Sequence, residues 1–242
     1  MMPSVPLPNS PAGQSSESQD KNIAVPVWDL AVRLGHWLLV LLVVFCWITG
    51  TYGALAWHRG GGYAILALVL FRIYWGFAGS GTARFSSFLR GPRAVWTHAR
   101  TLLERLGSGP TVGHTPLGGW SIVAMLLLLV VQSGLGLFAV DVDGIESGPL
   151  SDRVSFETGR LLAAWHGRVM NTLLILIGLH VAAIVHYWLY KRENLVGAML
   201  SGVKRLPPGT PPPPSFGTFW RAVIGLAAAA LAVLAIVTRL HF

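Results

Sequence analysis

The chain has 242 residues, of which 53% are hydrophobic and only 12% are charged, and its mean hydropathy is +0.58. This composition excludes an ordinary soluble domain of the same length and indicates a protein that lies in a lipid bilayer. The net charge is +8. In so apolar a chain, an excess of basic residues typically marks loops that lie beside anionic lipid. We therefore expect membrane lipid, and no nucleic acid, as a partner.

The chain begins with a polar segment, SVPLPNSPAGQSSESQDKN, that is rich in serine, proline and charged residues. This composition predicts a disordered tail over residues 1–26. The tail lacks the basic start and the apolar core of about 7–15 residues that define a signal peptide, so we expect that nothing is cleaved.

Five apolar segments follow, and each is long enough to cross a hydrocarbon core of roughly 30 Å, which takes about 20 helical residues. They lie near residues 34–54, 58–79, 117–139, 163–189 and 219–238. The stretch LPPGTPPPPS predicts a stiff, proline-rich linker within residues 203–218, before the last segment. We therefore expect an all-α integral membrane fold, with a four-helix bundle over residues 27–202 and a fifth transmembrane helix within residues 219–242.

The distribution of arginine and lysine predicts the orientation of the helices. The connection 80–116 carries five arginines against one acidic residue, whereas the connection 140–162 carries five acidic residues against two arginines. The first connection is therefore expected in the cytoplasm and the second outside. Five spans then place the N-terminus in the cytoplasm and the C-terminus outside.

The fourth apolar segment contains WHGRVMNTLLILIGLH, in which His166 and His180 are fourteen positions apart. At 100° per residue they share one helix face and are separated by roughly 21 Å along the axis. Met170, Leu173, Ile177 and Ile184 lie on the same stripe. Ionisable residues inside a membrane are costly and are candidates for function, so the two histidines are predicted to serve two sites at different depths.

The topology gives each of these histidines a partner. His36 lies near the cytoplasmic start of the first span, at the depth of His180, and His58 begins the second span on the external side, at the depth of His166. Each pair supplies what bis-histidine ligation of haem requires, one neutral imidazole for each face of the porphyrin, and Gly62 is a small residue beside His58 that would admit the ring.

Two other interpretations compete with haem. A lone histidine in a helix bundle is commonly a hydrogen-bonded core or interface residue, but matched depths in two pairs favour ligation. A zinc or iron centre would require a further carboxylate or thiolate, and none lies near the pairs in the sequence. The single cysteine, Cys46, is expected to be a packing residue.

The spans resemble the bacterial cytochrome b561 and nickel–iron hydrogenase b-type cytochrome superfamily over about residues 27–202. The motifs that carry the resemblance are VWDLAVRLGHW, HRGGGYAILALVLFRIYWGFAGS, GHTPLGGWSIVAMLLLLVVQSGLGLF and WHGRVMNTLLILIGLHVAAIVHYWLYKRENL. The resemblance implies a dihaem cytochrome b of the bacterial inner membrane, in which His36 and His180 hold one haem b and His58 and His166 the other. The fifth helix departs from the four-helix form of the family.

Further polar residues lie near the predicted sites. Arg72, fourteen positions after His58, is a candidate partner for a haem propionate or a snorkelling arginine. Arg33 is a weaker candidate for a propionate, and we favour the positive charge bias of cytoplasmic segments as its explanation. His186 is a candidate proton relay for a quinone or a residue of an interfacial aromatic belt, and His98 and His114 are expected on the surface.

Two haems without an open axial position predict electron transfer, because iron exchanges single electrons. We expect a path between the quinone pool and an external redox partner, either a c-type cytochrome or, as the resemblance implies, a hydrogenase or similar dehydrogenase. Two alternatives stay open. A superoxide:quinone oxidoreductase would need an external basic pocket, for which Arg59, Arg160 and Arg168 are candidates, and the other alternative is a non-redox transporter of haem or metal. The sequence leaves open whether the protein is itself an enzyme and whether two copies form a homodimer.

Overall fold

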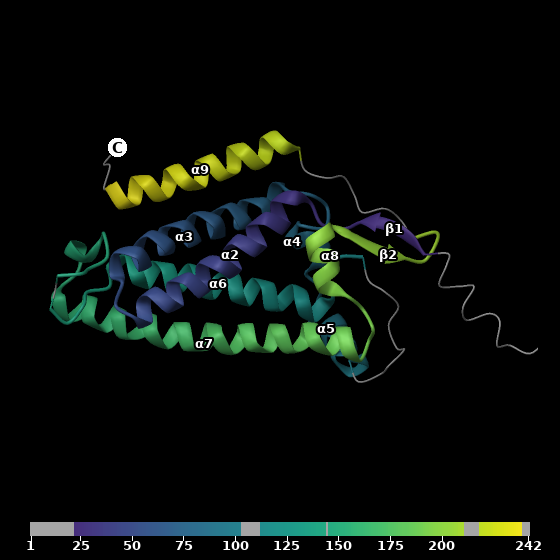
Figure 1. The fold of residues 1–242 in the computed structure, drawn as a ribbon, viewed down its shortest axis with the longest axis horizontal. Helices are drawn as coiled ribbons and strands as arrows, with labels where there is room; N and C mark the ends of the chain where they lie inside the picture. The colour runs from purple at the N-terminus through teal and green to yellow at the C-terminus, as the bar shows by residue number, and fades with distance from the viewer. Residues whose placement is uncertain (1–21, 103–111, 144, 211–217, 239–242) are drawn as a thin grey trace, which may run out of the picture.

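The computed structural model describes residues 22–102, 112–143, 145–210 and 218–238. Five long apolar helices dominate the fold (Figure 1). They are α2 (Leu30–Thr51), α3 (Leu55–Ala78), α6 (Pro116–Phe138), α7 (Phe156–Leu189) and α9 (Phe219–Thr238). Each is long and apolar enough to cross a membrane. The predicted all-α, multi-pass membrane architecture is confirmed.

The helix ends agree with the predicted spans except at α7, which begins at Phe156 and not near residue 163. The hydroxyl of Ser155 accepts a hydrogen bond from the Thr158 amide at 3.2 Å and so caps the helix. The first two turns of α7 are partly polar, which is why hydropathy alone placed its start too late.

The helix α3 lies at the centre of the packing, against α2, α6 and α9, while α7 packs along α6 (Figure 1). The main core gathers around Val69 of α3 and Leu173 of α7, which are almost completely buried. Cys46 is buried in this core as a free thiol, as expected of a packing residue.

The fifth helix, α9, runs alongside α3 at the edge of the bundle (Figure 1). Its buried residues are small or β-branched: Gly225, Ala229 and Val233. The ring of Tyr74 lies directly over Gly225, where a side chain would collide with it. Close approach of α9 to α3 therefore depends on a glycine at this position.

The helices α2 and α6 begin, and α3 and α7 terminate, at the same side of the bundle. We call this side the basic end, after the arginine-rich connection that it carries. The opposite end, with the acidic connection 139–155, is the acidic end. The short helices α4 (Phe85–Phe88), α5 (Pro92–Thr101) and α8 (Leu195–Ser201) gather at the basic end (Figure 1). The 3-10 turn η2 (Ser151–Arg153) lies at the acidic end.

A small antiparallel sheet at the basic end was not predicted. Its strands are β1 (Ile23–Pro26) and β2 (Val203–Leu206), paired with Ile23 opposite Leu206. The strand β1 falls within the predicted disordered tail and β2 within the predicted linker, so both predictions were wrong for these residues. The sheet forms because Val25 and Leu206 bury their side chains together in a small apolar cluster. Residues 1–21 of the tail and 211–217 of the linker lie outside the described residues.

Candidate functional site

At the acidic end, the rings of His58 and His166 face each other across the bundle. Their centroids are 5.8 Å apart, with an angle of 76° between the ring planes. The Nδ1 atom of His58 lies 2.8 Å from the Cys46 carbonyl oxygen, and that of His166 lies 2.9 Å from the Gln132 carbonyl oxygen. Because a carbonyl only accepts, each Nδ1 must donate. A second bond of this kind commonly orients metal-ligating histidines.

Two glycines make room for these rings. A Cβ atom on Gly50 would lie 2.9 Å from Nδ1 of His58, and one on Gly136 would lie 3.1 Å from Cε1 of His166. Gly62, and neither of these two glycines, was predicted to make room for a porphyrin ring beside His58. A Cβ atom on Gly62 would meet nothing within 4 Å among the described residues, so the face of α3 one turn from His58 is open.

At the basic end, His36 of α2 lies close enough to His180 of α7 and to Arg72 of α3 to interact with both electrostatically. The Nδ1 atom of His36 is buried and has no hydrogen-bond partner within the described part of the chain. The structure thus places His36, His180 and Arg72 near one another at the basic end.

The two histidine pairs are separated by the apolar core. Leu173 of α7 is 1% exposed, and Met170 and Ile177 pack against the same cluster. These three residues lie on the stripe that contains His166 and His180.

Arg72 sits beside a buried carboxylate that the sequence analysis missed. Its guanidinium donates to the Ala83 carbonyl oxygen at 3.3 Å, and the nearby opposite charge is Asp29, which is 8% exposed. Asp29 caps α2 by accepting from the Val32 amide at 2.7 Å. It also accepts from the Trp75 indole at 3.0 Å and from the Ser80 hydroxyl. An aspartate before an apolar run is a typical N-cap, and that signal was available in the sequence.

Arg33 is oriented differently. Its Nε donates to the Met199 carbonyl oxygen at 3.3 Å and its Nη2 to that of Leu200, so it caps the C-terminal end of α8. The helix ends at Gly202, whose φ of 82° brings its backbone close to the Arg33 guanidinium. The structure therefore groups Arg33 with α8 and not with the histidines.

His114, predicted on the surface, is enclosed at the basic end. Its ring lies between those of Trp28 and Phe88, with centroid distances of 4.4 Å and 4.7 Å. Burial, together with the nearby charges of Arg72, His180 and His36, lowers the pKa of His114 to about 3. The surface prediction was wrong, because the aromatic residues that cover His114 come from segments remote in the sequence.

His98 was also predicted on the surface and is buried. Its Nε2 lies 3.0 Å from the Tyr187 hydroxyl, which attaches α5 to the end of α7. Burial lowers the pKa of His98, and the charge of Lys191 adds to the effect. His186 stacks on Tyr190 at 5.2 Å, and its Nε2 lies 3.1 Å from the Leu102 carbonyl oxygen.

The three arginines near the acidic end each have a partner. Arg59 pairs with Glu146. Arg160 donates to the Val140 carbonyl oxygen at 3.1 Å, and the guanidinium of Arg168 lies 4.9 Å from the centroid of the Trp165 ring. They do not converge on one pocket.

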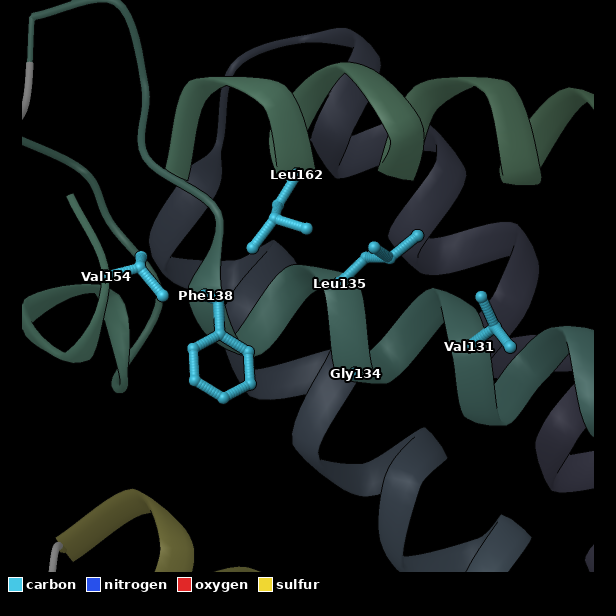
Figure 2. A pocket seen from close by; sticks show the side chains of 6 residues that line it. All are labelled: Val131, Gly134, Leu135, Phe138, Val154 and Leu162. Atoms are coloured by element: carbon cyan, nitrogen blue, oxygen red, sulfur yellow. The ribbon is translucent and has the colours of Figure 1, made fainter. Parts of the chain in front are cut away.

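A hollow of about 410 Å³ lies near the same end, between α6 and α7 (Figure 2). It is lined by Val131, Gly134, Leu135, Phe138, Val154 and Leu162. None of these side chains titrates or ligates a metal, so the hollow offers an apolar shape and no chemistry. Among the described residues, no group of three or more histidine, cysteine or acidic side chains is arranged to hold a metal ion.

Comparison with known proteins places these features in a family context. Residues 27–202 match the family described as prokaryotic cytochrome b561. Two probable Ni/Fe-hydrogenase B-type cytochrome subunits, from Azotobacter chroococcum mcd 1 and Azotobacter vinelandii, are each 24% identical to the chain, over 78% of its length and 92% of their own. One from Cupriavidus necator is 26% identical over 75% of the chain and 87% of its own length. No solved structure matches the chain.

Proposed function

The chain belongs to the prokaryotic cytochrome b561 family, and on this premise we propose that it is a dihaem b-type cytochrome that carries electrons across the membrane. His58 and His166 are proposed to hold one haem b, and His36 and His180 the other. Arg72 is proposed to face a propionate of the second haem. A haem with two imidazole ligands exchanges single electrons and has no open position for oxygen.

The geometry of His58 and His166 carries this proposal. Two metal–nitrogen bonds of about 2 Å each, with the radii of the two rings, require a centroid separation of about 6 Å. The rings are 5.8 Å apart, which is close to this value. The bonds from their Nδ1 atoms to backbone carbonyls leave Nε2 of each ring as the nitrogen that would bind the iron.

The vertical arrangement supports a path across the bilayer. His166 and His180 lie on the same helix, roughly 21 Å apart along its axis, so the two sites lie at different depths. The apolar core around Leu173 lies between them. Such a pair of sites suits electron transfer between the two faces of a membrane better than chemistry at a single face.

The charge distribution supports an orientation in the bacterial inner membrane. The arginine-rich basic end is proposed to face the cytoplasm, with the N-terminus, and the acidic end to face the periplasm, with the C-terminus. His36 and His180 would then form the cytoplasmic site, and His58 and His166 the periplasmic site.

The redox partners are inferred from this orientation and from the relatives. We infer that the cytoplasmic site exchanges electrons with the quinone pool. Because the relatives are named as hydrogenase cytochrome subunits, a hydrogenase is the favoured periplasmic partner, with the chain as one subunit of an oxidoreductase. A c-type cytochrome attracted by the acidic connection is the alternative partner.

The superoxide:quinone oxidoreductase hypothesis loses support from the arginines at the acidic end. Superoxide would require free positive charge near the periplasmic haem, but Arg59 is paired with Glu146 and Arg160 is bonded to a backbone carbonyl. Stopped-flow mixing with superoxide distinguishes the two hypotheses. We expect no haem reduction above that of a control in which superoxide dismutase is present, and fast reduction would reinstate the alternative.

A haem count tests the proposed function itself. The protein purified in detergent is assayed by pyridine haemochrome, and then mixed with a short-chain quinol while the haem absorption bands are followed. We expect two b haems per chain and reduction by the quinol. A haem-free protein would refute the proposal and favour the non-redox transporter, and one haem per chain would refute the dihaem assignment.

A further inference from the structure

The imidazole of His114 has a buried polar atom without a partner. Its Nδ1 is buried and makes no hydrogen bond within the described part of the chain. Leaving such a group unpaired costs free energy, and native structures almost always pair it with protein, water or a ligand. This atom is therefore a candidate for a hydrogen bond to a bound ligand.

The loop that carries His114 is well anchored. Gly113 adopts a φ of 83°, which favours glycine, and a Cβ atom there would lie 3.8 Å from Cγ2 of Thr82. Thr82 in turn donates to the Val27 carbonyl oxygen at 2.6 Å, just before α2. Thr115 follows His114 and caps α6 by accepting from the Gly118 amide. His114 is thus held between the start of α2, the loop after α3 and the start of α6.

The groups that face His114 are all basic. They come from three helices, as Arg72 of α3, His36 of α2 and His180 of α7. The nearby carboxylate, Asp29, already accepts from the Val32 amide, the Trp75 indole and the Ser80 hydroxyl. Arg72 supplies positive charge, and the hydrogen bonds that Asp29 accepts already engage the nearby carboxylate, so the ligand group that best complements the site is an oxygen anion.

We propose that His114 and Arg72 together bind a carboxylate, namely a propionate of the haem held between His36 and His180. This inference rests on the proposed function. Arg72 supplies the charge, and the single N–H of a neutral imidazole supplies a directed hydrogen bond. Burial keeps His114 neutral at physiological pH, since its pKa is lowered to about 3. A haem propionate is the carboxylate that a ligand bound between these two histidines brings with it.

Redox titration of the purified protein, which resolves the two haems by their midpoint potentials, tests the inference. His114→Phe keeps an aromatic ring but removes the N–H that donates the hydrogen bond. The negative charge of the propionate is then less compensated, and it stabilises the oxidised haem relative to the reduced haem. We expect the potential of the haem at His36 and His180 to fall, and that of the other haem to stay unchanged. His114→Gln, which retains an N–H donor, should recover the wild-type potential.

The matched control is His98→Phe, which removes a second buried histidine of the same connection whose partner is the Tyr187 hydroxyl. It should leave both potentials unchanged. If His114→Phe retains two haems at wild-type potentials, the inference is wrong. It is also wrong if the potentials stay the same and only the oxidation of quinol slows, because the ring nitrogen would then act at the quinone site. A wild-type protein without two haems would refute the proposed function itself. If His114→Phe does not fold, His114→Gln and His114→Leu are compared instead. A wild-type potential of the haem at His36 and His180 in His114→Gln, with a lowered potential in His114→Leu, supports the inference. Equal potentials in the two variants overturn it.

Discussion

His58 of α3 and His166 of α7 hold their rings 5.8 Å apart while each donates its Nδ1–H to a backbone carbonyl. The carbonyls belong to two other helices, Cys46 of α2 and Gln132 of α6. All four helices of the bundle therefore fix this one pair. The site is organised by backbone atoms, and conservative changes in the surrounding side chains should disturb it little.

The space that Gly136 leaves for the ring of His166 can be tested by substitution. A Cβ atom there would lie 3.1 Å from the ring, so Gly136→Val should displace the imidazole and selectively reduce the haem content at the acidic end. Gly134→Val is the matched control, because a Cβ atom at Gly134 meets nothing within 4 Å among the described residues. The pyridine haemochrome assay measures both variants. Equal haem loss from Gly136→Val and Gly134→Val would show that the loss comes from the helix propensity of valine and not from contact with His166.

The buried carboxylate of Asp29 is expected to stabilise the fold strongly. Asp29→Ala removes a helix cap and leaves the Trp75 indole and the Ser80 hydroxyl without their acceptor, which should cost about 2–4 kcal/mol. Ser155→Ala removes an exposed cap of α7 and should cost about 1 kcal/mol. Thermal unfolding in detergent compares the two. A similar loss in both variants would contradict the role of Asp29 as a junction between α2 and the end of α3.

The attachment of α5 to α7 should weaken in acid. Because burial lowers the pKa of His98, the folded state keeps its imidazole neutral, whereas the unfolded segment binds a proton near pH 6.5. The unfolded state then binds more protons, so stability falls as the pH drops from about 6.5 towards the lowered pKa. The protection factors of the α5 amides, which correct the observed hydrogen exchange for its intrinsic pH dependence, should therefore fall on acidification.

His98→Gln isolates this contribution, since its amide can still bond with the Tyr187 hydroxyl but does not titrate in this range. His114, whose pKa is also lowered, remains in the variant and accounts for any shared background. An acid-induced loss of protection in α5 that is equal in wild type and His98→Gln would rule out His98 as its source.

The haem-binding unit is predicted to end after β2. Truncation after Thr210 removes α9 and should leave both haems, because the four histidines lie on α2, α3 and α7. Truncation after Gly202 also removes β2, whose Leu206 is completely buried against β1. We expect this shorter chain to melt at a lower temperature. Loss of a haem from the longer truncation would show that α9 belongs to the cofactor site.

Hydropathy and spacing predicted most of the fold, because a bilayer imposes long apolar helices that are visible in a single sequence. The depth of each histidine followed from its distance to a helix end. The β1–β2 sheet could not be predicted in this way, since its strands are four residues long and almost 180 positions apart. Pairing at that distance depends on tertiary contacts such as Val25 with Leu206.

The site was predicted in outline and not in its supporting residues. The grouping of His36, His180 and Arg72 followed from helix geometry, whereas the position of His114 depends on Trp28 and Phe88, which only the folded chain brings to it. For Arg33, the sequence favoured the positive charge bias of cytoplasmic segments over a propionate contact. Its bonds to the carbonyl oxygens at the end of α8 could not be predicted, because α8 is remote in the sequence.

Redox titration of single-histidine variants is the most direct test of two separate haem sites on one helix. His58→Ala and His166→Ala should each lose the same one of the two titrating haems, and His36→Ala and His180→Ala should each lose the other. Circular dichroism confirms that each variant keeps its helices. Folded variants that all lose the same haem, or that all lose both, would contradict the arrangement of two independent bis-histidine sites.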